Sequence, residues 1–418
     1  MTAVAENLGL NIAIDRDALK RRLRAVEQKR RLRALALVLP LFLFILLSFV
    51  IPIGELLRNA VFDPSIHANM PLTVTALTQW DGKDLPDEAA YAALATDLAA
   101  ATKAKTVALV GKRLNYEISG IRSKILTSGR KAALLTAGPY KDAMIGIDKV
   151  WGERDTWAVL KRASQTYTSF YVLDALDLGL DADGKLTPTP EERAIYITVF
   201  LRTLKISLTV TVVTLLLGFP LAYLLATLPT RTSNLLMILV LLPFWTSLLV
   251  RTTAWFVLLQ DNGTINDLLI ALHLTDHPLP LIFSRFGTVV AMTHIQLPFT
   301  LLPIYSVMKT ISPSYVRAGR SLGAGPFYAF WRIYFPLTVP RIAAGCLLTF
   351  ILSLGYYITP ALVGGPTDQM VSGIIERAMN SENNWGKASA LGGILLFATL
   401  ILYFIYNRLV GIDKIRLG

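Results

Sequence analysis

The stretch SYVRAGRSLGAGPFYAFWRIYFPLTVPR, residues 314–341, separates two long apolar segments of the chain. It contains no acidic residue and four arginines, namely Arg317, Arg320, Arg332 and Arg341. The pattern predicts two short helices with a break at the glycines of residues 323–325. Because positive charge collects in the cytoplasmic loops of membrane proteins, we expect a structured cytoplasmic loop between two membrane spans.

The composition of the whole chain supports a membrane location. Of its 418 residues, 53% are hydrophobic, and the mean hydropathy is +0.51, which is typical of a polytopic membrane protein rather than a soluble one. The net charge of +12 is attributed to cytoplasmic loops, so no nucleic-acid partner is expected. The single cysteine, Cys346, excludes a disulfide framework and a cysteine-based metal site, and the four histidines show no metal-ligand spacing.

Six apolar segments predict an all-α membrane protein with six transmembrane helices. The first, Leu35–Gly54, is expected to be a retained helix within residues 35–58 and not a cleaved secretory signal. Each of the other five contains or borders proline or glycine, which suits helices that bend along a pathway. Their expected bounds are Ile206–Leu228, Leu235–Leu259, Phe286–Met308, Thr338–Ile358 and Ala388–Tyr406.

The distribution of charge predicts that both termini are cytoplasmic. Residues 1–34 form a basic segment, and residues 411–418 form a short basic tail. Within the first segment, Asp15–Arg33 is either a basic helix on the inner leaflet or simply a charge signal that stays inside. Residues 196–410 are expected to form a core of five helices, with the basic loop at 314–341.

Residues 59–195 contain no run that could span a membrane and are nearly balanced in charge. Helical periodicity is expected in Asp87–Leu114, Ile118–Leu135 and Trp157–Leu178, and aromatic residues are frequent. A disordered linker would contain fewer aromatic residues. We therefore expect a small, mostly helical extracytoplasmic domain between helices one and two. Its role would be to receive a partner protein or to shield the pathway entrance; the alternative is a structural ornament without a role in transport.

Nothing in the sequence predicts an enzyme. The chain lacks a nucleotide-binding P-loop, a nucleophile elbow and an HExxH motif. Polar and aromatic residues in or near the spans are the candidates for lining a transport pathway. They are Trp245, Arg251, Trp255, His294, Gln296, Tyr356, Tyr357, Glu376 and Glu382.

Each of these candidates also has a structural interpretation. Arg251 could extend to the membrane interface, and His294 and Gln296 could form hydrogen bonds between helices. The two tyrosines could belong to an interfacial aromatic belt, and the two glutamates to a solvated loop. A cationic solute would favour tyrosines, tryptophans and carboxylates, whereas Arg251 would oppose it if it faced the pathway.

The 314–341 stretch resembles the "EAA" loop of permease subunits of binding-protein-dependent ABC importers. That pattern is Glu-Ala-Ala, three residues, Gly, nine residues, Ile, one residue and Leu-Pro. In this chain it falls on Arg317, Ala318, Gly319, Gly323, Ile333, Phe335 and Pro336. Arg317 replaces the glutamate, Gly319 the second alanine and Phe335 the leucine. The resemblance implies that this loop is the coupling helix that docks on an ATPase subunit.

Further phrases are similar to the spermidine/putrescine branch of these permeases. They are GFPLAYLLA (218–226), LLPFWTSLLVRTTAW (241–255), LPFTLLPIY (297–305), FILSLGYYITPALVGGP (350–366) and NNWGKASAL (383–391). The resemblance implies a bacterial inner-membrane importer of a polyamine or a related amine or amino-acid-like solute. It also implies a second permease, identical or homologous, two ATPase subunits that hold ATP and magnesium, and an extracytoplasmic solute-binding protein.

Two other functions fit the sequence less well. An ion-coupled secondary transporter would require buried carboxylates or an inverted repeat, and no acidic residue lies inside spans two to six. A membrane-anchored receptor or scaffold built around residues 59–195 would not need six spans interrupted by proline and glycine.

Overall fold

The computed structural model describes residues 26–410, and these are mostly helical. The expected basic segment 1–34 therefore lies mainly outside the described residues, as does the tail 411–418. The chain divides into two compact units, one ending at Arg58 and the other beginning at Asn59, and each is described by itself.

The described part of the first unit is one helix of 34 residues, which runs from Val26 to Asn59, where the second unit begins. It contains a π-helical turn, η1 (Leu46–Val50), followed by α2 (Ile51–Asn59). Pro52 lies just after this turn. Because proline has no N–H group and crowds the carbonyl four residues earlier, a local π-turn is a way to keep the helix continuous. The helix includes the predicted span Leu35–Gly54 and is long enough to cross a bilayer.

Five helices of the described residues are long and apolar enough to cross a membrane, or six if one bent pair is a single span. They are Val26–Asn59, α11 (Tyr196–Thr227), α15 (Arg285–Thr310), Pro326–Leu354 and α21 (Trp385–Val410). The helix Pro326–Leu354 comprises α17 (Pro326–Ala329), the π-helix η4 (Phe330–Tyr334) and α18 (Phe335–Leu354). Each overlaps a predicted apolar segment.

The predicted span Leu235–Leu259 is not one straight helix. The structure has α12 (Thr230–Leu241), η3 (Leu242–Trp245) and α13 (Leu248–Leu258), with a bend of 96° between Thr230–Trp245 and Leu248–Leu258. Pro243 begins the turn, and the Ser247 hydroxyl accepts a 3.2 Å hydrogen bond from Val250 N to start α13. A proline and a capping serine so close together stop one helix and start another.

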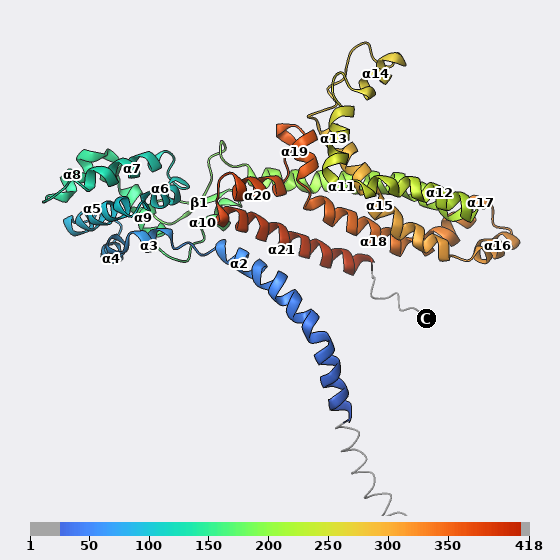
Figure 1. The fold of residues 1–418 in the computed structure, drawn as a ribbon, viewed down its shortest axis with the longest axis horizontal. Coiled ribbons are helices and arrows are strands. Elements are labelled where there is room, and N and C mark those ends of the chain that lie inside the picture. Colours follow the sequence, from blue (N-terminus) through green and yellow to red (C-terminus); the bar gives the residue numbers. More distant parts are fainter. Residues whose placement is uncertain (1–25, 411–418) are drawn as a thin grey trace, which may run out of the picture. The chain divides into compact units, whose positions relative to one another are not determined.

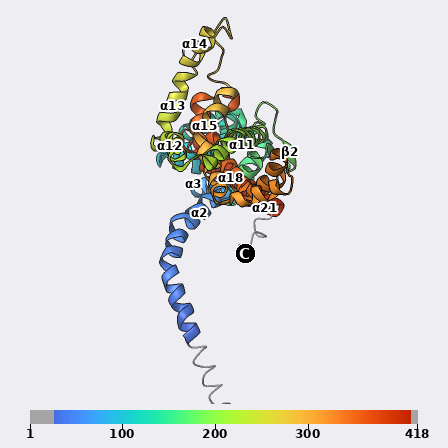
Figure 2. The same cartoon turned by 90° about the vertical axis from the view of Figure 1, so that its right-hand side faces the viewer.

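Helices α11, α15 and α18 pack together as the membrane core (Figure 1), and the end-on view in Figure 2 shows the same grouping. The Thr300 hydroxyl lies 3.1 Å from that of Thr214 and 2.6 Å from that of Thr349, which joins the three helices. At Gly345, an added Cβ would lie 2.9 Å from the Thr300 carbonyl oxygen. A small residue therefore permits the close approach of α15 and α18.

Residues 59–195 form a mostly helical cluster with its own core. Trp151 and Trp157 are fully buried there, and the Trp151 carbonyl accepts hydrogen bonds from Tyr91 Oη at 2.6 Å and Trp157 Nε1 at 2.9 Å. The helices are α3 (Ser65–Asn69), α4 (Pro71–Gln79), α5 (Glu88–Lys103), α6 (Val107–Asn115), α7 (Ile121–Ala132), α8 (Tyr140–Ile147), η2 (Lys149–Gly152), α9 (Arg154–Ala163) and α10 (Phe170–Asp174).

Two of the helices expected in this region are shorter than predicted. The Asp87–Leu114 segment is divided between α5 and α6, and Lys105 in the connection has a φ of 61°. The Trp157–Leu178 segment contains the end of α9, all of α10 and the first residue of strand β1 (Leu178–Leu180). β1 pairs antiparallel with β2 (Leu186–Pro188), with Leu178 opposite Pro188, a hairpin that the sequence did not predict.

The inserted region is joined to the membrane core near the start of α11. The Asp177 carboxylate accepts hydrogen bonds from Tyr196 N at 3.0 Å and Ile197 N at 2.7 Å, and so caps α11. Tyr171 of α10 packs against Gly386 of α21. The remaining elements are α14 (Thr264–Ala271), α16 (Pro313–Ser321), α19 (Ile358–Val363), η5 (Pro366–Asp368) and α20 (Val371–Asn380).

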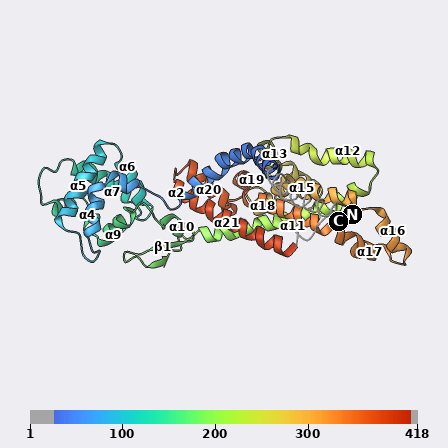
Figure 3. The same cartoon turned by 90° about the horizontal axis from the view of Figure 1, so that it is seen from below.

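Helix α11 has 32 residues, which corresponds to about 48 Å of helix. Its first residues contact the inserted region, whereas Tyr223 and Ala226 near its last residue line a cavity with α16. In the view from below, α16 and α17 lie at the end of the bundle away from α10 and β1 (Figure 3). The inserted region and the basic loop are therefore separated by a membrane-spanning length of helix.

Candidate functional site

The basic loop begins with a capped helix and ends at the predicted glycine break. Ser312 accepts a hydrogen bond from Ser314 N at the start of α16. At its end, Ala324 N donates to Gly319 O at 3.1 Å and Gly323 N donates to Arg320 O at 3.0 Å. Gly323 has a φ of 91°, the left-handed conformation that glycine adopts most easily. These two bonds and this φ form a Schellman motif that fixes the end of α16.

The second helix of the loop is not a separate short helix. From Pro326 the chain is helical to Leu354. The helix therefore begins twelve residues before the predicted span Thr338–Ile358. Pro326 occupies the first helical turn, where its missing N–H group leaves no carbonyl unpaired. The π-turn η4 directly precedes Pro336 and accommodates it within a continuous helix.

Two positions of the resembling pattern contact each other across the break. A Cβ atom added at Gly319 would overlap Ile333 Cδ1, so α16 lies directly on the helix that continues into α18. Glycine in place of alanine at position 319 therefore leaves room for the Ile333 side chain. This contact makes α16 and the membrane helix one packed element.

A cavity of about 440 Å³ lies between the loop and the C-terminal end of α11. Arg317 and Arg320 line it, together with the aromatic side chains of Tyr223, Phe330 and Tyr334. The rings of Tyr223 and Tyr334 are 5.5 Å apart in an edge-to-face arrangement. No acidic side chain lines this cavity, so it presents positive charge beside an aromatic wall.

The outer surface of the loop combines exposed apolar and cationic side chains. Leu322 is 89% exposed and Phe327 is 77% exposed, on either side of the glycine break. Arg317, Arg320 and Arg332 are also exposed. Exposed apolar side chains rimmed by charge are typical of a protein-docking surface.

Three of the predicted pathway residues lie together near the 96° bend. Trp255 Nε1 on α13 donates a 3.0 Å hydrogen bond to His294 Nδ1 on α15. Arg251 Cζ lies 5.6 Å from the centre of the Phe244 ring. Arg251 Nε is buried and has no hydrogen-bond partner among residues 26–410. The cluster can therefore offer a guanidinium N–H group and an imidazole to a polar ligand, whereas the Trp255 N–H group is already used within the cluster.

Of the other predicted pathway residues, Trp245 ends the helix before the bend and Tyr356 lies within electrostatic range of Arg251, whereas Gln296 lies in a helix interface. Gln296 is fully buried and accepts a 2.7 Å hydrogen bond from Ser353, so it joins α15 to α18. Trp245 is 81% exposed and Tyr357 is 40% exposed on the surface of this chain. Tyr356 is half-buried, and its carbonyl accepts a hydrogen bond from the Ser372 hydroxyl.

The two glutamates do not join the Arg251 cluster. Glu376 accepts a 3.0 Å hydrogen bond from Asn380 on α20. Glu382 pairs with Lys387 at 3.2 Å, beside the join with the inserted region. Both carboxylates therefore have partners, Glu376 within α20 and Glu382 at the start of α21.

Sequence reasoning missed one polar pair at the other end of α15. Arg285 Nε lies 2.9 Å from Asp368 Oδ1, and the Asp368 side chain is only 4% exposed. The pair connects the start of α15 to η5. Neither residue lies inside an apolar run, so hydropathy alone does not single them out. Their opposite charges, in segments that flank neighbouring spans, are the sequence signal that could have indicated the pair.

No catalytic group or metal centre emerges from the described part of the chain. Among residues 26–410, no three His, Cys, Asp or Glu side chains are grouped so that they could hold a metal ion. The structure therefore offers two candidate functional surfaces, the loop with its neighbouring cavity and the Arg251 cluster.

Comparison with known proteins identifies relatives of the membrane core. Residues 216–411 match the family described as "Binding-protein-dependent transport system inner membrane component". The spermidine/putrescine transport system permease protein PotB of Haemophilus influenzae is 33% identical over 216 residues, which is 51% of this chain and 75% of that protein. The inner membrane ABC transporter permease protein YdcU of Escherichia coli K12 is 32% identical over 229 residues, covering 51% of this chain and 71% of that protein.

A solved structure also matches the chain. The crystal structure of a bacterial ABC transporter involved in the import of the acidic polysaccharide alginate matches with a TM-score of 0.41 and 20% identity, over 52% of this chain and 80% of that chain. The identity to PotB over three quarters of that relative is the decisive comparison. This chain belongs to the family of inner membrane components of binding-protein-dependent transport systems and is the permease subunit of an ABC importer.

Proposed function

We propose that this permease subunit forms half of the translocation pathway for a small organic solute, and that a separate ATPase drives it through residues 314–336. The observation that carries the proposal is the packing of Gly319 on Ile333, which joins α16 to a helix that continues without interruption to Leu354. A force applied to α16 would reach the membrane helix without crossing a flexible hinge.

The exposed surface of the loop supports a docking role. Leu322 and Phe327 offer apolar contacts, and the arginines offer positive charge to a partner. Because this chain carries Arg317 where the family pattern has glutamate, the partner's groove would have to accept a cation. We propose that two ATPase subunits, with ATP and magnesium, act beneath this chain and a second permease, and that nucleotide binding shifts the pair between two conformations.

The arrangement along α11 supports an orientation in the membrane. The inserted region is near one end of this helix and the basic loop is at the other, about 48 Å away. If the basic loop is cytoplasmic, then residues 59–195 are extracytoplasmic. With one span before these residues and five after them, both termini would lie in the cytoplasm. An extracytoplasmic solute-binding protein would then meet the permease on the side of the inserted region.

The solute is proposed to be a polyamine or a related amine or amino-acid-like compound. This rests on the printed names of relatives such as PotB. Within this chain, Trp255 and His294 are the candidate contacts for the solute, with Trp245 and Tyr357 as exposed candidates and Tyr356 as a half-buried one. Because a guanidinium repels a polyamine, Arg251 in the same cluster would favour an amino-acid-like solute that carries a carboxylate. A second permease would supply the other half of the pathway.

The test is gentle purification of the chain from its native membrane, followed by mass spectrometry of the co-eluting proteins. We expect an ATPase subunit and either a second permease or a second copy of this chain. Cross-linking from Arg317 and Arg320 should reach the ATPase. If the chain elutes without an ATPase even after cross-linking at these residues, the proposed coupling is wrong.

A matched pair of glycine variants tests the docking loop more sharply. Gly323 has a φ of 91°, whereas Gly325 has a φ of −65° with open space around its Cβ position. Alanine at 323 adds about 1–2 kcal/mol of left-handed strain, and alanine at 325 adds none. We expect Gly323→Ala to lower solute uptake driven by ATP hydrolysis, and Gly325→Ala to leave it near the wild-type rate.

Asparagine tolerates the left-handed conformation better than alanine, so Gly323→Asn should recover part of the uptake. Uptake would be measured in vesicles that contain the co-purified complex. Equal uptake by the Gly323→Ala and Gly325→Ala variants would contradict a docking role for the end of α16.

A further inference from the structure

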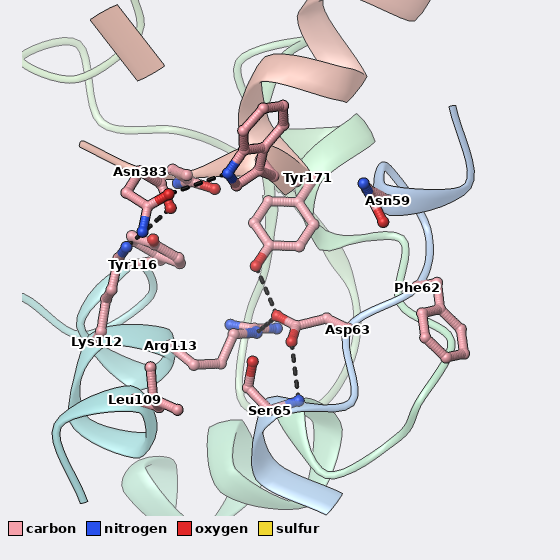
Figure 4. Close-up of a pocket in the computed structure, with 13 residues that line it drawn as sticks. Asn59, Phe62, Asp63, Ser65, Leu109, Lys112, Arg113, Tyr116, Tyr171 and Asn383 are labelled. Carbon is pink, nitrogen blue, oxygen red and sulfur yellow. Dashed lines mark hydrogen bonds and ion pairs between the residues drawn. The ribbon is translucent and has the colours of Figure 1, made fainter. Parts of the chain in front are cut away.

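A pocket of about 360 Å³ lies where the inserted region meets the last membrane helix, outside both surfaces described above (Figure 4). Its walls come from residues 59–65, from α6, from Tyr171 of α10 and from residues 383–386 at the start of α21. Its volume falls within the range of about 300–1,000 Å³ that is usual for small-ligand pockets.

The main polar group of the pocket is the Arg113 guanidinium, whose side chain is only 2% exposed. Its Nε lies 2.9 Å from Asp63 Oδ2 as an ion pair, and its Nη1 donates to Glu117 Oε1 at 2.9 Å. Nε has that ion pair but no hydrogen bond, and the third nitrogen, Nη2, has no hydrogen-bond partner among the described residues. Figure 4 shows Arg113 beside Asp63 and below the Tyr171 hydroxyl. Because buried donors are nearly always paired, an acceptor is expected at this position.

A second cation borders the same pocket. Lys112 Nζ reaches only a neutral acceptor, the Asn383 carbonyl oxygen, at 2.9 Å. Burial and then the nearby Arg122 charge lower the pKa of Lys112 below its ordinary value. Asp63 is already engaged, since it also accepts hydrogen bonds from Tyr171 Oη at 2.6 Å and Ser65 N at 3.0 Å. An incoming anion would therefore meet two cations and two carboxylates that are already engaged, Asp63 in the pocket wall and Glu117 on Arg113.

The pocket lies at the level expected for lipid headgroups. The apolar run of α21 begins at Ala388, and Trp385 of the pocket lies three residues earlier, about 4.5 Å along the helix. The polar zone on each side of the hydrocarbon core is roughly 5–7 Å thick. Trp385 and Tyr116 line the pocket as interfacial aromatic residues do, and Leu109 at its edge is 52% exposed.

We propose that this pocket binds the phosphate of an anionic phospholipid headgroup, with Arg113 Nη2 and Lys112 Nζ as its donors. Phosphate oxygens are strong acceptors for guanidinium and ammonium groups. Basic pockets beside membrane helices are typical sites for anionic headgroups. Because α6 and the start of α21 form opposite walls, the lipid would join the inserted region to the membrane core.

The test uses the full chain in nanodiscs of phosphatidylcholine, with and without a minority of phosphatidylglycerol. Native mass spectrometry measures which lipid is retained. We expect phosphatidylglycerol to be retained with roughly tenfold preference. Lys112→Gln should reduce that preference roughly tenfold, because one charge-assisted contact is lost. Lys103→Gln, an exposed lysine on α5 outside the pocket, should retain it.

A second variant addresses Arg113 directly. Arg113→Lys keeps the positive charge but removes Nη2, and should also lose the preference. If that variant does not fold, Lys112→Gln decides the question. Equal retention of both lipids, or an unchanged preference in Lys112→Gln, would overturn the proposal. The last arm adds millimolar inorganic phosphate to the protein in pure phosphatidylcholine. If phosphate stabilises the protein as much as phosphatidylglycerol does, the pocket is a site for soluble phosphate and not for a lipid.

Discussion

At the residue scale, Asp97 is a buried carboxylate that the inserted region accommodates without a cation in hydrogen-bond contact. It is 3% exposed and accepts hydrogen bonds from Thr73 N at 2.7 Å and Thr73 Oγ1 at 2.8 Å. Burial raises the pKa of Asp97 above its ordinary value of 3.8, although the Thr73 hydrogen bonds act in the opposite direction. The stability that its proton contributes is complete below pH 3.8 and is lost as the pH rises through the folded-state pKa.

We therefore predict that Asp97→Asn stabilises the inserted region at neutral pH, because the amide oxygen can accept both hydrogen bonds without a buried charge. The advantage over wild type should shrink as the pH falls through the raised folded-state pKa of Asp97 and its carboxyl becomes protonated. Hydrogen exchange of the α4 and α5 amides in the full chain at several pH values measures this. Asp84→Asn, at an exposed position, is the control. If Asp97→Asn were less stable at pH 7, the attraction between the Asp97 charge and the N-terminus of α4 would outweigh the cost of burying that charge.

The loop at residues 314–341 shows how far single residues could be predicted. The spacing located the break at Gly323, because a left-handed turn at the end of a helix favours glycine. The contact between Gly319 and Ile333 could not be predicted, since it depends on how the two helices meet in space. The sequence identifies Trp255 and His294 as aromatic or polar residues near the spans. It does not predict that they pair, because that also depends on how two helices meet.

At the element scale, the close packing of α15 and α18 depends on Gly345. An added Cβ there would lie 2.9 Å from the Thr300 carbonyl oxygen, which is backbone and cannot rotate away. We predict that Gly345→Ala separates the two helices and destabilises the core by about 1–3 kcal/mol. Thermal unfolding of the purified chain measures the loss. Gly392→Ala on α21 is the control, because the nearest atom to its Cβ position, Ile375 Cδ1, is 4.0 Å away.

An unfolding temperature of Gly345→Ala equal to that of the control would mean that α18 can shift along α15 without loss. In that case the hydroxyl contacts of Thr300 with Thr214 and Thr349 should also be dispensable. The valine or serine substitution of Thr300 would then distinguish packing from hydrogen bonding, because serine keeps the hydroxyl and valine keeps the shape.

Apolar runs predicted the positions of the membrane helices well and their ends poorly. The α11 helix begins at Tyr196, ten residues before the predicted Ile206, because a helix can continue beyond the hydrocarbon and carry Arg202 and Lys205. The 96° bend before α13 was not predicted, since hydropathy measures composition and not direction. In the inserted region, the break at Lys105 lies in an alanine-rich stretch without glycine or proline to signal it.

At the scale of the whole molecule, the inserted region is packed against the transport core and not merely tethered to it. Tyr171, Tyr196 and Leu391 belong to one buried cluster that joins α10, α11 and α21. Asp177 caps α11 from the inserted side. A domain held in this way keeps a fixed position relative to the entrance of the helices. This suits the proposed reception of a solute-binding protein better than a flexible ornament would.

Gly386 is the position where this join can be broken with a single methyl group. Its added Cβ would lie 2.5 Å from Cε2 and Cζ of the Tyr171 ring, which is 5% exposed and held by its hydrogen bond to Asp63. We predict that Gly386→Ala increases hydrogen exchange in α10 and in residues 59–65, while the α5–α7 core stays protected. Gly146→Ala, where nothing lies within 4 Å, should leave exchange unchanged.

The transport consequence separates two uses of the inserted region. If the join positions it for a binding protein, Gly386→Ala should lower solute uptake several-fold without reducing the amount of co-purified ATPase, because the coupling loop lies at the far end of α11. Unchanged uptake together with increased exchange in α10 would show that the fixed position does not matter for transport. A loss of ATPase together with uptake would show instead that the join supports the whole membrane core, since strain at Gly386 would then have reached the loop through α21 and α11.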